Sequence, residues 1–347
     1  MRALTVAPRQ PDSARLDDVD EPPLSDGAVL VRALAVGVCG TDREIIAGKH
    51  GAPPVGQQRL ILGHESVGVV VEAPDDVGLA AGDLVAGIVR RPDPVPCASC
   101  AVGEWDMCRN GGFTERGIKE RHGFCAERFR LEPEFTVKVD ARLGELGVLL
   151  EPASVVAKVW DHIERIGRRS AFLPRRVLVT GAGPIGLLAA LLGVQRGLDV
   201  HVLDRVQEGR KPEIVAALGA TYHSAGIEEA GRCSDVVIEC TGAPDVVLGA
   251  IAVARPCGIV CLTGLSAPGS ALSVDVGALT REVVLENNVV FGSVNANRAH
   301  YEQAATALAA ADPTWLRRLI TRRAPLSRWQ EAVSQQPDDV KNVIVFA

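Results

Sequence analysis

The sequence predicts an α/β protein in which a β-rich domain is combined with a domain built on a doubly wound parallel sheet. Short β-like runs separated by turn residues fill the first 155 residues, and from Arg176 onward predicted strands alternate with predicted helices. Such alternation is typical of a parallel sheet with helices on both faces. A chain of 347 residues, 47% of them hydrophobic, can also bury enough apolar surface for two domains.

The β-rich part is expected to form strands at residues 29–36, 67–71 and 83–89, and not to form a parallel sheet. Segments rich in glycine and proline, at 51–54 and 92–96, are expected to be loops. Between 154 and 167 the apolar residues recur at three- and four-residue steps, which predicts a helix.

The stretch 176–204 has the order strand, glycine-rich turn, helix, strand and acidic residue. The turn fits the motif G-x-G-x-x-G through Gly181, Gly183, Pro184, Ile185 and Gly186, and Asp204 ends the second strand. In such a motif one glycine makes the turn, one lets the backbone approach a pyrophosphate, and one lets the helix pack on the strand. The free N–H groups at the helix N-terminus favour the anion. The stretch therefore predicts a dinucleotide site.

Two other interpretations of this stretch are an ordinary glycine-rich turn of another α/β sheet and a membrane helix at 177–194, which Thr180, Pro184 and the glycines disfavour. Further strands are expected at 235–240, 258–262 and 289–291, and a helix at 246–254. The chain is expected to end with a helix at 301–311 and a strand at 342–346.

The composition excludes some classes of partner. The formal net charge of −6 leaves no basic surface of the kind that binds nucleic acid. No segment has the pattern of a signal peptide or a membrane anchor, and nine cysteines in such a chain suggest reduced thiols or metal ligands instead of disulfides. We therefore expect a cytoplasmic protein with no membrane and no nucleic-acid partner.

A candidate zinc site lies upstream of the dinucleotide motif. Cys39, His64, Glu65 and Glu151 offer a thiolate, an imidazole and carboxylates, with a position left for substrate or water. Zinc in such a site would stabilise an alkoxide during hydride transfer, and Thr41 could pass the released proton towards solvent. Each residue also has a structural interpretation: a buried thiol, a core histidine, and a carboxylate at a helix N-terminus.

A second thiol cluster consists of Cys97, Cys100 and Cys108, in a loop rich in proline. The C-x2-C spacing is common in zinc sites, but a closed structural site needs four ligands. Asp93 or Asp106 could be the fourth ligand, or the loop could carry reduced thiols without metal.

Seven segments of the chain together resemble one protein family. They are CGTDREIIAGKHG (39–51), LGHESVGVV (62–70), VRRP (89–92), GEWDMC (103–108), ERGIKERHGF (115–124), LLEPASVVAK (149–158) and GSVNANRAHY (292–301). The chain resembles the zinc-dependent medium-chain dehydrogenases and, among them, the glucose (aldose) dehydrogenases best known from archaea. The resemblance implies a GroES-like catalytic domain at 1–155 and 293–347, and a Rossmann domain for a nicotinamide dinucleotide at 156–292.

The resemblance also implies roles for single residues. Cys39 and His64 match ligands of the catalytic zinc, Glu65 matches a carboxylate beside it, and Thr41 matches the hydroxyl of the proton relay. Glu151 falls where the family places a residue that meets the zinc or the sugar. Glu115 and Asn295 match positions that hydrogen-bond sugar hydroxyls. We expect the cofactor to contact the glycine-rich turn together with Asp204, Arg205, Thr241 and Asn295.

Two departures from the family bear on these expectations. The thiol loop lacks the first of the family's four cysteines, so its metal is expected to be weak or absent. Asp204 stands where the archaeal sugar enzymes tend to have an uncharged residue followed by arginines. A carboxylate there suits the ribose 2′-hydroxyl and repels a 2′-phosphate, so we expect NAD to be preferred, with NADP as a second option.

The expected reaction is oxidation of the anomeric hydroxyl of an aldose to a lactone, with hydride transfer to NAD(P)+. The alternatives are a zinc dehydrogenase of another polyol, cyclitol or secondary alcohol, and a non-catalytic member that binds nucleotide. We also expect a homo-oligomer, either a dimer or a tetramer.

Overall fold

The computed structural model describes residues 1–266, 269 and 272–346, and the chain divides into two compact units. Unit 1 comprises Met1–Ser154 and Asn295–Ala347, and unit 2 comprises Val155–Val294. The boundary between Ser154 and Val155 falls inside helix α3 (Leu150–Gly167), so the first residues of this helix belong to unit 1 and the rest to unit 2. In the described residues no helix is both long enough and apolar enough to cross a membrane.

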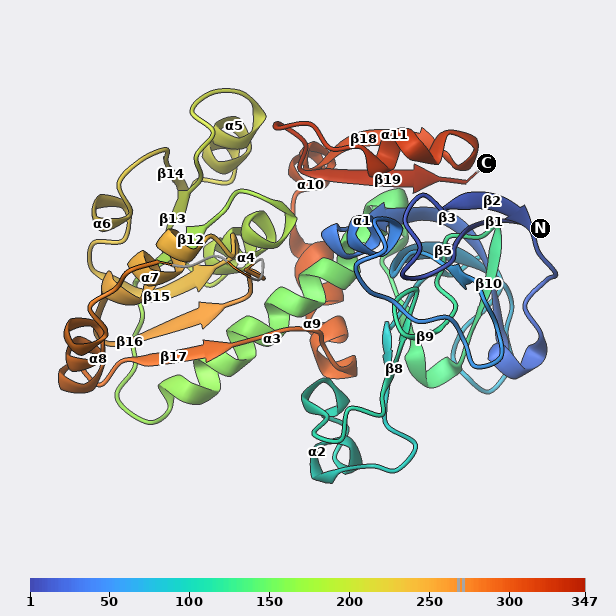
Figure 1. The fold of residues 1–347 in the computed structure, drawn as a ribbon, viewed down its shortest axis with the longest axis horizontal. Helices are drawn as coiled ribbons and strands as arrows, with labels where there is room; N and C mark the ends of the chain where they lie inside the picture. The colour runs from blue at the N-terminus through green and yellow to red at the C-terminus, as the bar shows by residue number, and fades with distance from the viewer. Residues whose placement is uncertain (267–268, 270–271, 347) are drawn as a thin grey trace. The chain divides into compact units, whose positions relative to one another are not determined.

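Unit 1 is built on three β-sheets (Figure 1). The largest has the order β11 (Thr136–Lys138), β6 (Leu84–Gly87), β5 (Glu65–Glu72), β3 (Val29–Val38), β19 (Lys341–Val345) and β18 (Ile320–Pro325), and β10 (Arg128–Leu131) also pairs with β3. The others are β2 (Arg15–Asp18), β1 (Arg2–Val6) and β4 (Leu60–Ile61), and β7 (Arg90–Arg91), β8 (Thr114–Arg116) and β9 (Glu120–Arg121). Most pairs are antiparallel, although β18–β19 and β8–β9 are parallel, so this part does not form a parallel sheet, as expected.

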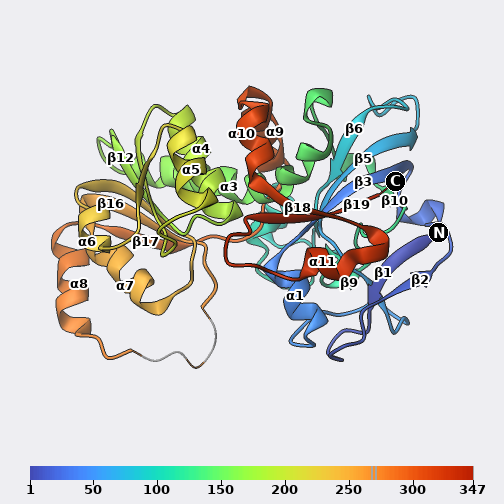
Figure 2. The same cartoon turned by 90° about the horizontal axis from the view of Figure 1, so that it is seen from above.

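The helices of unit 1 are short and follow its strands. They are α1 (Gly40–Ile46), α2 (Ala98–Ala101), the start of α3, α9 (Arg298–Ala310), α10 (Pro313–Leu319) and α11 (Trp329–Val333). Single 3-10 turns lie at Leu24–Asp26, Trp105–Met107, Pro133–Phe135 and Leu326–Arg328, and a longer 3-10 segment at Ala141–Leu149 leads into α3. In both views of the chain, α11 lies along the pair β18–β19 (Figures 1 and 2).

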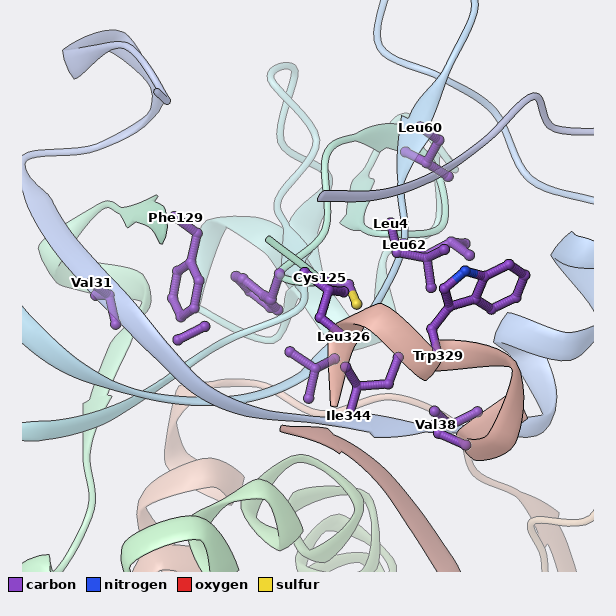
Figure 3. Packing of buried hydrophobic residues seen from close by; sticks show 14 of the residues in the cluster. Leu4, Val31, Val38, Leu60, Leu62, Cys125, Phe129, Leu326, Trp329 and Ile344 are labelled. Atoms are coloured by element: carbon purple, nitrogen blue, oxygen red, sulfur yellow. The ribbon is translucent and has the colours of Figure 1, made fainter. Parts of the chain in front are cut away.

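An apolar core joins the two ends of the chain inside unit 1 (Figure 3). Side chains of β3, such as Val31, pack in one cluster with Phe129 of β10, and with Trp329 and Ile344 from the C-terminal segment. Each large apolar side chain buried in this way contributes roughly 1.5–3 kcal/mol. The C-terminal segment is therefore an integral part of the same domain as the N-terminal strands.

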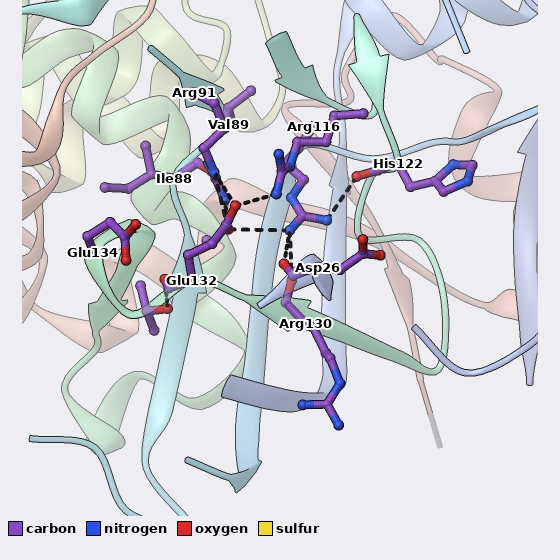
Figure 4. Close-up of polar contacts among 12 residues, drawn as sticks. Asp26, Ile88, Val89, Arg91, Arg116, His122, Arg130, Glu132 and Glu134 are labelled. Carbon is purple, nitrogen blue, oxygen red and sulfur yellow. Dashed lines mark hydrogen bonds and ion pairs between the residues drawn. The ribbon is translucent and has the colours of Figure 1, made fainter. Parts of the chain in front are cut away.

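A partly buried group of charges lies beside this core (Figure 4). Arg91 and Arg121 donate hydrogen bonds to the Glu132 carboxylate, and Arg116 donates to the backbone oxygens of His122, Asp26 and Arg130. Burial alone would raise the pKa of Glu132, but the hydrogen bond and charge of Arg91, with the other arginines, lower it to about 2. Burial, together with the neighbouring arginines, lowers the pKa of Arg116 to about 9.

Unit 2 contains one six-stranded parallel sheet with helices on both faces (Figures 1 and 2). Its order is β14 (Thr221–His223), β13 (Asp199–Leu203), β12 (Arg176–Thr180), β15 (Ser234–Glu239), β16 (Ala254–Leu262) and β17 (Val289–Gly292). The helices are the rest of α3, α4 (Pro184–Gln195), α5 (Arg210–Ala217), α6 (Ile227–Ala230), α7 (Pro244–Ala252) and α8 (Val276–Leu285). The strand order reverses between β12 and β15, which is the order of a Rossmann fold and places ligands at the carboxyl ends of these strands.

The predicted fold class is confirmed, and the errors are in single elements. The helix expected at 246–254 ends at Ala252, because Ala254 already pairs with Ser234 as the first residue of β16. The strand expected at 67–71 begins at Glu65, so a predicted zinc ligand is part of the strand. The elements β14, α5, α10 and α11 were missed because they are short, and α8 was missed although Val276, Leu279 and Val283 recur at helical steps.

Candidate active site

The candidate metal site begins where β3 ends. Cys39 follows Val38, the last residue of that strand, and is the N-terminal cap of α1. The backbone N–H of Cys39 donates a hydrogen bond of 2.8 Å to Oδ2 of Asp42, one turn into the helix. This capping arrangement fixes the conformation of the backbone from which the thiol projects.

His64 and Glu65 reach the same place from β5. Gly63 makes the turn before them with φ of 87°, a conformation that favours glycine. One ligand atom each from Cys39, His64 and Glu65 lies within 4.8 Å of the others. Nδ1 of His64 lies 3.4 Å from Oδ1 of Asp42, so Asp42 supports both the thiol segment and the imidazole and leaves the other ring nitrogen for a metal.

Lys341, the first residue of β19, pairs with Glu65. Its Nζ lies 2.6 Å from both carboxylate oxygens of Glu65, and both side chains are 2% exposed. Gly37 of β3 lies between the two strands, and a Cβ at that position would be 1.9 Å from Oε2 of Glu65. The absence of a side chain at Gly37 is therefore what allows Glu65 and Lys341 to meet.

The surroundings of His64 are strongly negative. Burial alone would lower the pKa of His64, yet the Asp42 carboxylate and Cys39 raise it well above its usual value. Burial also raises the pKa of Glu151 to about 7, against the opposing effect of His64. The thiol, imidazole and carboxylates of this site therefore stabilise a positive charge between them. These groups are also the ligand types that zinc prefers.

Two predicted residues stand beside the three donors. Oγ1 of Thr41 lies 4.0 Å from Sγ of Cys39, on the first turn of α1. Glu151 lies on the first turn of α3 and is not one of the three donors that gather within 4.8 Å. The pKa of Glu151 responds to the charges of His64 and Glu65, so it belongs to the same electrostatic group.

The two predicted sugar-binding residues are in contact. Nδ2 of Asn295 donates a hydrogen bond of 2.8 Å to Oε1 of Glu115, which also accepts 3.0 Å and 2.9 Å bonds from Arg90. Asn295 has a left-handed backbone with φ of 62°, which is uncommon outside glycine and is often found at functional sites. Arg90 lies in the VRRP segment and was missed as a partner of Glu115, because no motif assigns it a role.

The three thiols of the Cys97 loop also gather. The ligand atoms of Cys97, Cys100 and Cys108 lie within 4.8 Å of one another. Neither aspartate proposed as fourth ligand joins this group within the described chain: Asp93 accepts hydrogen bonds from the backbone of Val95 and Gly112, and Asp106 accepts one from Asn297. The structure thus brings three ligands together at this loop.

The dinucleotide motif of unit 2 has the geometry that its glycines imply. Gly181 has φ of 89°, and a Cβ at Gly186 would lie 1.8 Å from the Gly181 oxygen, so helix α4 could not pack there with any other residue. A Cβ at Gly183 would meet nothing within 4 Å, which leaves open space at the N-terminus of α4. Open space beside free N–H groups is what a pyrophosphate requires.

Asp204 is held in place more firmly than the sequence suggests. Oδ2 accepts a 2.7 Å bond from the N–H of Ala182 and lies 3.1 Å from Nζ of Lys211, while Oδ1 accepts a 3.0 Å bond from Val206. Burial would raise the pKa of Asp204, but these hydrogen bonds and the Lys211 charge lower it. Arg205 is exposed, and the Thr241 hydroxyl donates to the Glu239 carboxylate.

Sequence reasoning missed the residues that support the site. Asp42 lies inside the C-G-T-D segment and could have been suggested by its place three residues after Cys39. Lys341 and Glu239 carry no local signal, because their partners are brought to them by sheet pairing.

Comparisons with known proteins agree with this geometry. Residues 25–141 match the family model of the alcohol dehydrogenase GroES-like domain, and residues 144–346 match that of the glucose dehydrogenase C-terminus. The chain is 40% identical to glucose 1-dehydrogenase of Methanocella arvoryzae, with 99% of each chain covered. It is also 40% identical to glucose 1-dehydrogenase 1 of Caldivirga maquilingensis, with 99% of this chain and 98% of the relative covered.

Among solved structures, the chain is similar to Haloferax mediterranei glucose dehydrogenase in complex with NADP, Zn and gluconolactone. The TM-score is 0.91 at 34% identity, and the match covers 100% of this chain and 99% of the other. The GroES-like domain, the Rossmann sheet and the Cys-His-Glu donors together define the class of zinc-dependent medium-chain dehydrogenases. Within that class, the chain belongs to the glucose dehydrogenase family.

Proposed function

We propose that this protein is a zinc-dependent dehydrogenase that oxidises the anomeric hydroxyl of an aldose such as glucose to the lactone and transfers a hydride to NAD(P)+. The observation that carries the proposal is the convergence of Cys39, His64 and Glu65, with Asp42 and Lys341 supporting two of them. Relatives at 40% identity named glucose 1-dehydrogenase, and the gluconolactone complex of the Haloferax enzyme, support the choice of an aldose.

Cys39, His64 and Glu65 would hold the zinc, and Glu151 would be either a fourth ligand or a contact to the substrate. When bound, zinc acts as a Lewis acid that lowers the pKa of a hydroxyl and stabilises the alkoxide. Lys341 donates hydrogen bonds to the buried Glu65 carboxylate, and Asp42 orients the imidazole of His64. Thr41, with its hydroxyl 4.0 Å from the Cys39 sulfur, would accept the substrate proton and pass it towards solvent.

Glu115 and Asn295 would bind the sugar hydroxyls. A polyol presents donors and acceptors on neighbouring carbons, and a carboxylate hydrogen-bonded to an amide offers both kinds of partner. Arg90 holds the Glu115 carboxylate in place through two hydrogen bonds. A site built to pair hydroxyl groups rejects alcohols that lack them, because its own polar groups are then left unpaired.

Nicotinamide dinucleotide would bind at the turn of Gly181, Gly183 and Gly186, and we propose that NAD is preferred over NADP. Like charges about 4 Å apart repel by roughly 4 kcal/mol at an effective dielectric near 20, so the Asp204 carboxylate opposes a 2′-phosphate. Lys211, 3.1 Å from that carboxylate, offsets part of the repulsion and leaves NADP usable. Measuring kcat/KM for both cofactors in wild type and in Asp204→Ala tests this: the variant should gain with NADP and lose with NAD. A strong NADP preference in the wild type, unchanged in the variant, would contradict it.

A panel of aldoses, polyols and cyclitols, each assayed with both cofactors, tests the proposed substrate class. We expect an aldose to give the highest kcat/KM and the lactone to be the product. A polyol or cyclitol that exceeds every aldose would show that the enzyme belongs to the alternative class, while the metal and cofactor residues keep their roles.

We further propose that the enzyme is a homo-oligomer. Helix α8 buries none of its residues, and its Val284 and Leu285 are 73% and 64% exposed. Strand β17 forms the edge of the parallel sheet next to it in sequence, and both features suit an interface between copies. Light scattering after chromatography should give a dimer or tetramer, and Leu285→Glu should shift it towards the monomer.

The proposed compartment is the cytoplasm. All nine cysteines are free thiols, three of them close together at the Cys97 loop. Such thiols are stable in a reducing environment. Recovery of the protein in the soluble cytoplasmic fraction, with nine titratable thiols after denaturation, would support the assignment.

A further inference from the structure

Glu239 occupies the point at which the order of the parallel sheet reverses. It is the last residue of β15, is wholly buried, and is next to Thr180, the last residue of β12. The Thr180 hydroxyl donates a 3.2 Å hydrogen bond to Oε1 of Glu239. A carboxylate therefore joins the carboxyl ends of the two central strands, where ligands of this sheet type bind.

The carboxylate also organises the loop that follows β15. Oε1 accepts a 2.7 Å bond from the N–H of Thr241, a bond from the Thr241 hydroxyl, and a 3.1 Å bond from the N–H of Gly242. The backbone oxygen of Glu239 accepts bonds of 2.8 Å and 3.1 Å from Thr263 and Gly264, which follow β16. One buried residue thus connects the ends of β12, β15 and β16.

The segments held by Glu239 are packed too closely for side chains. A Cβ at Gly264 would lie 2.1 Å from the nitrogen of Gly242 and 2.7 Å from Oε2 of Glu239. Gly242 has φ of 66°, which favours glycine. The methyl group of Thr241 would lie 3.0 Å from a Cβ on Gly181, the first glycine of the dinucleotide turn. A shift of Glu239 would therefore also move Thr241, whose methyl group lies next to Gly181 of the dinucleotide turn.

We propose that Glu239 is a positioning residue for the dinucleotide and that its negative charge favours the oxidised cofactor over the reduced one. The oxidised nicotinamide ring carries a positive charge that the reduced ring lacks, and a buried carboxylate near the binding crevice attracts that charge. The inference rests on the proposed function, because it requires that the cofactor is a nicotinamide dinucleotide. It deepens that proposal, since binding the oxidised form more tightly suits an enzyme that works in the direction of sugar oxidation.

The test measures dissociation constants of oxidised and reduced cofactor separately, by fluorescence titration of the full chain without sugar. Glu239→Gln removes the charge with little change of shape, and it should weaken the oxidised form about tenfold more than the reduced form. Thr241→Val retains the charge and removes one donor, so it should weaken both forms by the same factor. Glu228→Gln, the same change at an exposed position of α6, should alter neither constant.

An equal loss for both forms in Glu239→Gln would overturn the role of the charge, and wild-type constants in Glu239→Gln would overturn the whole inference. If Glu239→Gln does not fold, Thr180→Val and Thr241→Val still test the positioning, and unchanged binding in both would overturn it. A wild type that binds the cofactor but oxidises no aldose would refute the proposed substrate and leave this inference standing.

Discussion

Two groups of thiol-containing ligands lie in unit 1, and they differ in their surroundings. Around Cys39 the donors are of three kinds, His64 and Glu65 are 4% and 1% exposed, and each of these two is matched by a buried charged partner. Around Cys97 the donors are three thiols, two of them half-buried. The backbone N–H of Arg109, 3.4 Å from Sγ, and further hydrogen bonds from Cys100 and Ser99 lower the pKa of Cys97 to about 6.

The comparison shows that two groups of ligands can gather equally closely and still differ in the residues around them. The residues that orient the ligands and balance their charge contribute to metal affinity nearly as much as the ligands themselves. The Cys39 group has buried charged partners, whereas the Cys97 group is held by backbone hydrogen bonds and gathers no fourth ligand among the described residues. We therefore expect one tightly bound zinc per chain, and the variants below test the contrast.

The largest effect is expected from Cys39→Ser. Loss of the thiolate removes a zinc ligand, so kcat/KM should fall by about a thousandfold or more and bound zinc should be lost. Metal analysis and steady-state kinetics check this, with Cys233→Ser, an exposed thiol of unit 2, as the matched control. Full activity in Cys39→Ser, or in zinc-free protein, would show that the Cys39 group is not the catalytic centre.

Thr41→Val should lower kcat by roughly a hundredfold, because the hydroxyl beside Cys39 is needed to carry the proton away. Zinc content and the dissociation constant of the cofactor should stay at wild-type values. Thr41→Ser, which retains the hydroxyl, should recover most of the activity. An unchanged kcat in Thr41→Val would rule out the relay.

Lys341→Met should weaken zinc binding by about 10- to 100-fold, since it leaves the Glu65 carboxylate buried without its partner. Competition with a chelator measures the affinity. Lys341→Arg retains the charge and should keep part of the affinity. Unchanged zinc affinity in Lys341→Met would mean that the pairing of Lys341 with Glu65 does not contribute to zinc binding. The proposed difference between the Cys39 and Cys97 groups would then be wrong.

Glu132→Gln is the control for this variant, because it also breaks a partly buried ion-pair group of unit 1 but lies outside the donor set. The pKa of Glu132 is lowered from 4.5 to about 2, which corresponds to roughly 3 kcal/mol of stability. That stability is present above about pH 4.5 and is lost as the pH falls towards 2. At pH 7 the control should therefore unfold more easily and keep its zinc affinity.

The smallest effect is expected from Cys108→Ser in the thiol loop. Because that loop has three ligands and little support, the change should leave kcat near the wild-type value and alter the free energy of unfolding by about 1 kcal/mol or less. Two tightly held zinc ions per chain in the wild type, with a marked loss of stability in the variant, would show that another side chain completes this site.

Much of the fold could be predicted because its signals are local. The strand, turn, helix and strand of residues 176–204 follow from apolar runs and from the glycine motif, in which Gly181 and Gly186 leave no room for a side chain. The predicted strand at 29–36 became β3, and the helix expected at 301–311 is covered by α9 (Arg298–Ala310) apart from its last residue. Very short elements, such as α11, gave no such signal.

The sequence by itself determined the class of fold, the dinucleotide turn and the types of ligand available, since each depends on neighbours along the chain. The tertiary structure decided which of those ligands meet and what supports them. Lys341 reaches Glu65 because β19 pairs with β3 at Gly37, and Glu239 meets Thr180 because β12 and β15 are adjacent. Pairings between strands far apart in sequence depend on the packing of the whole sheet, and no local pattern records them.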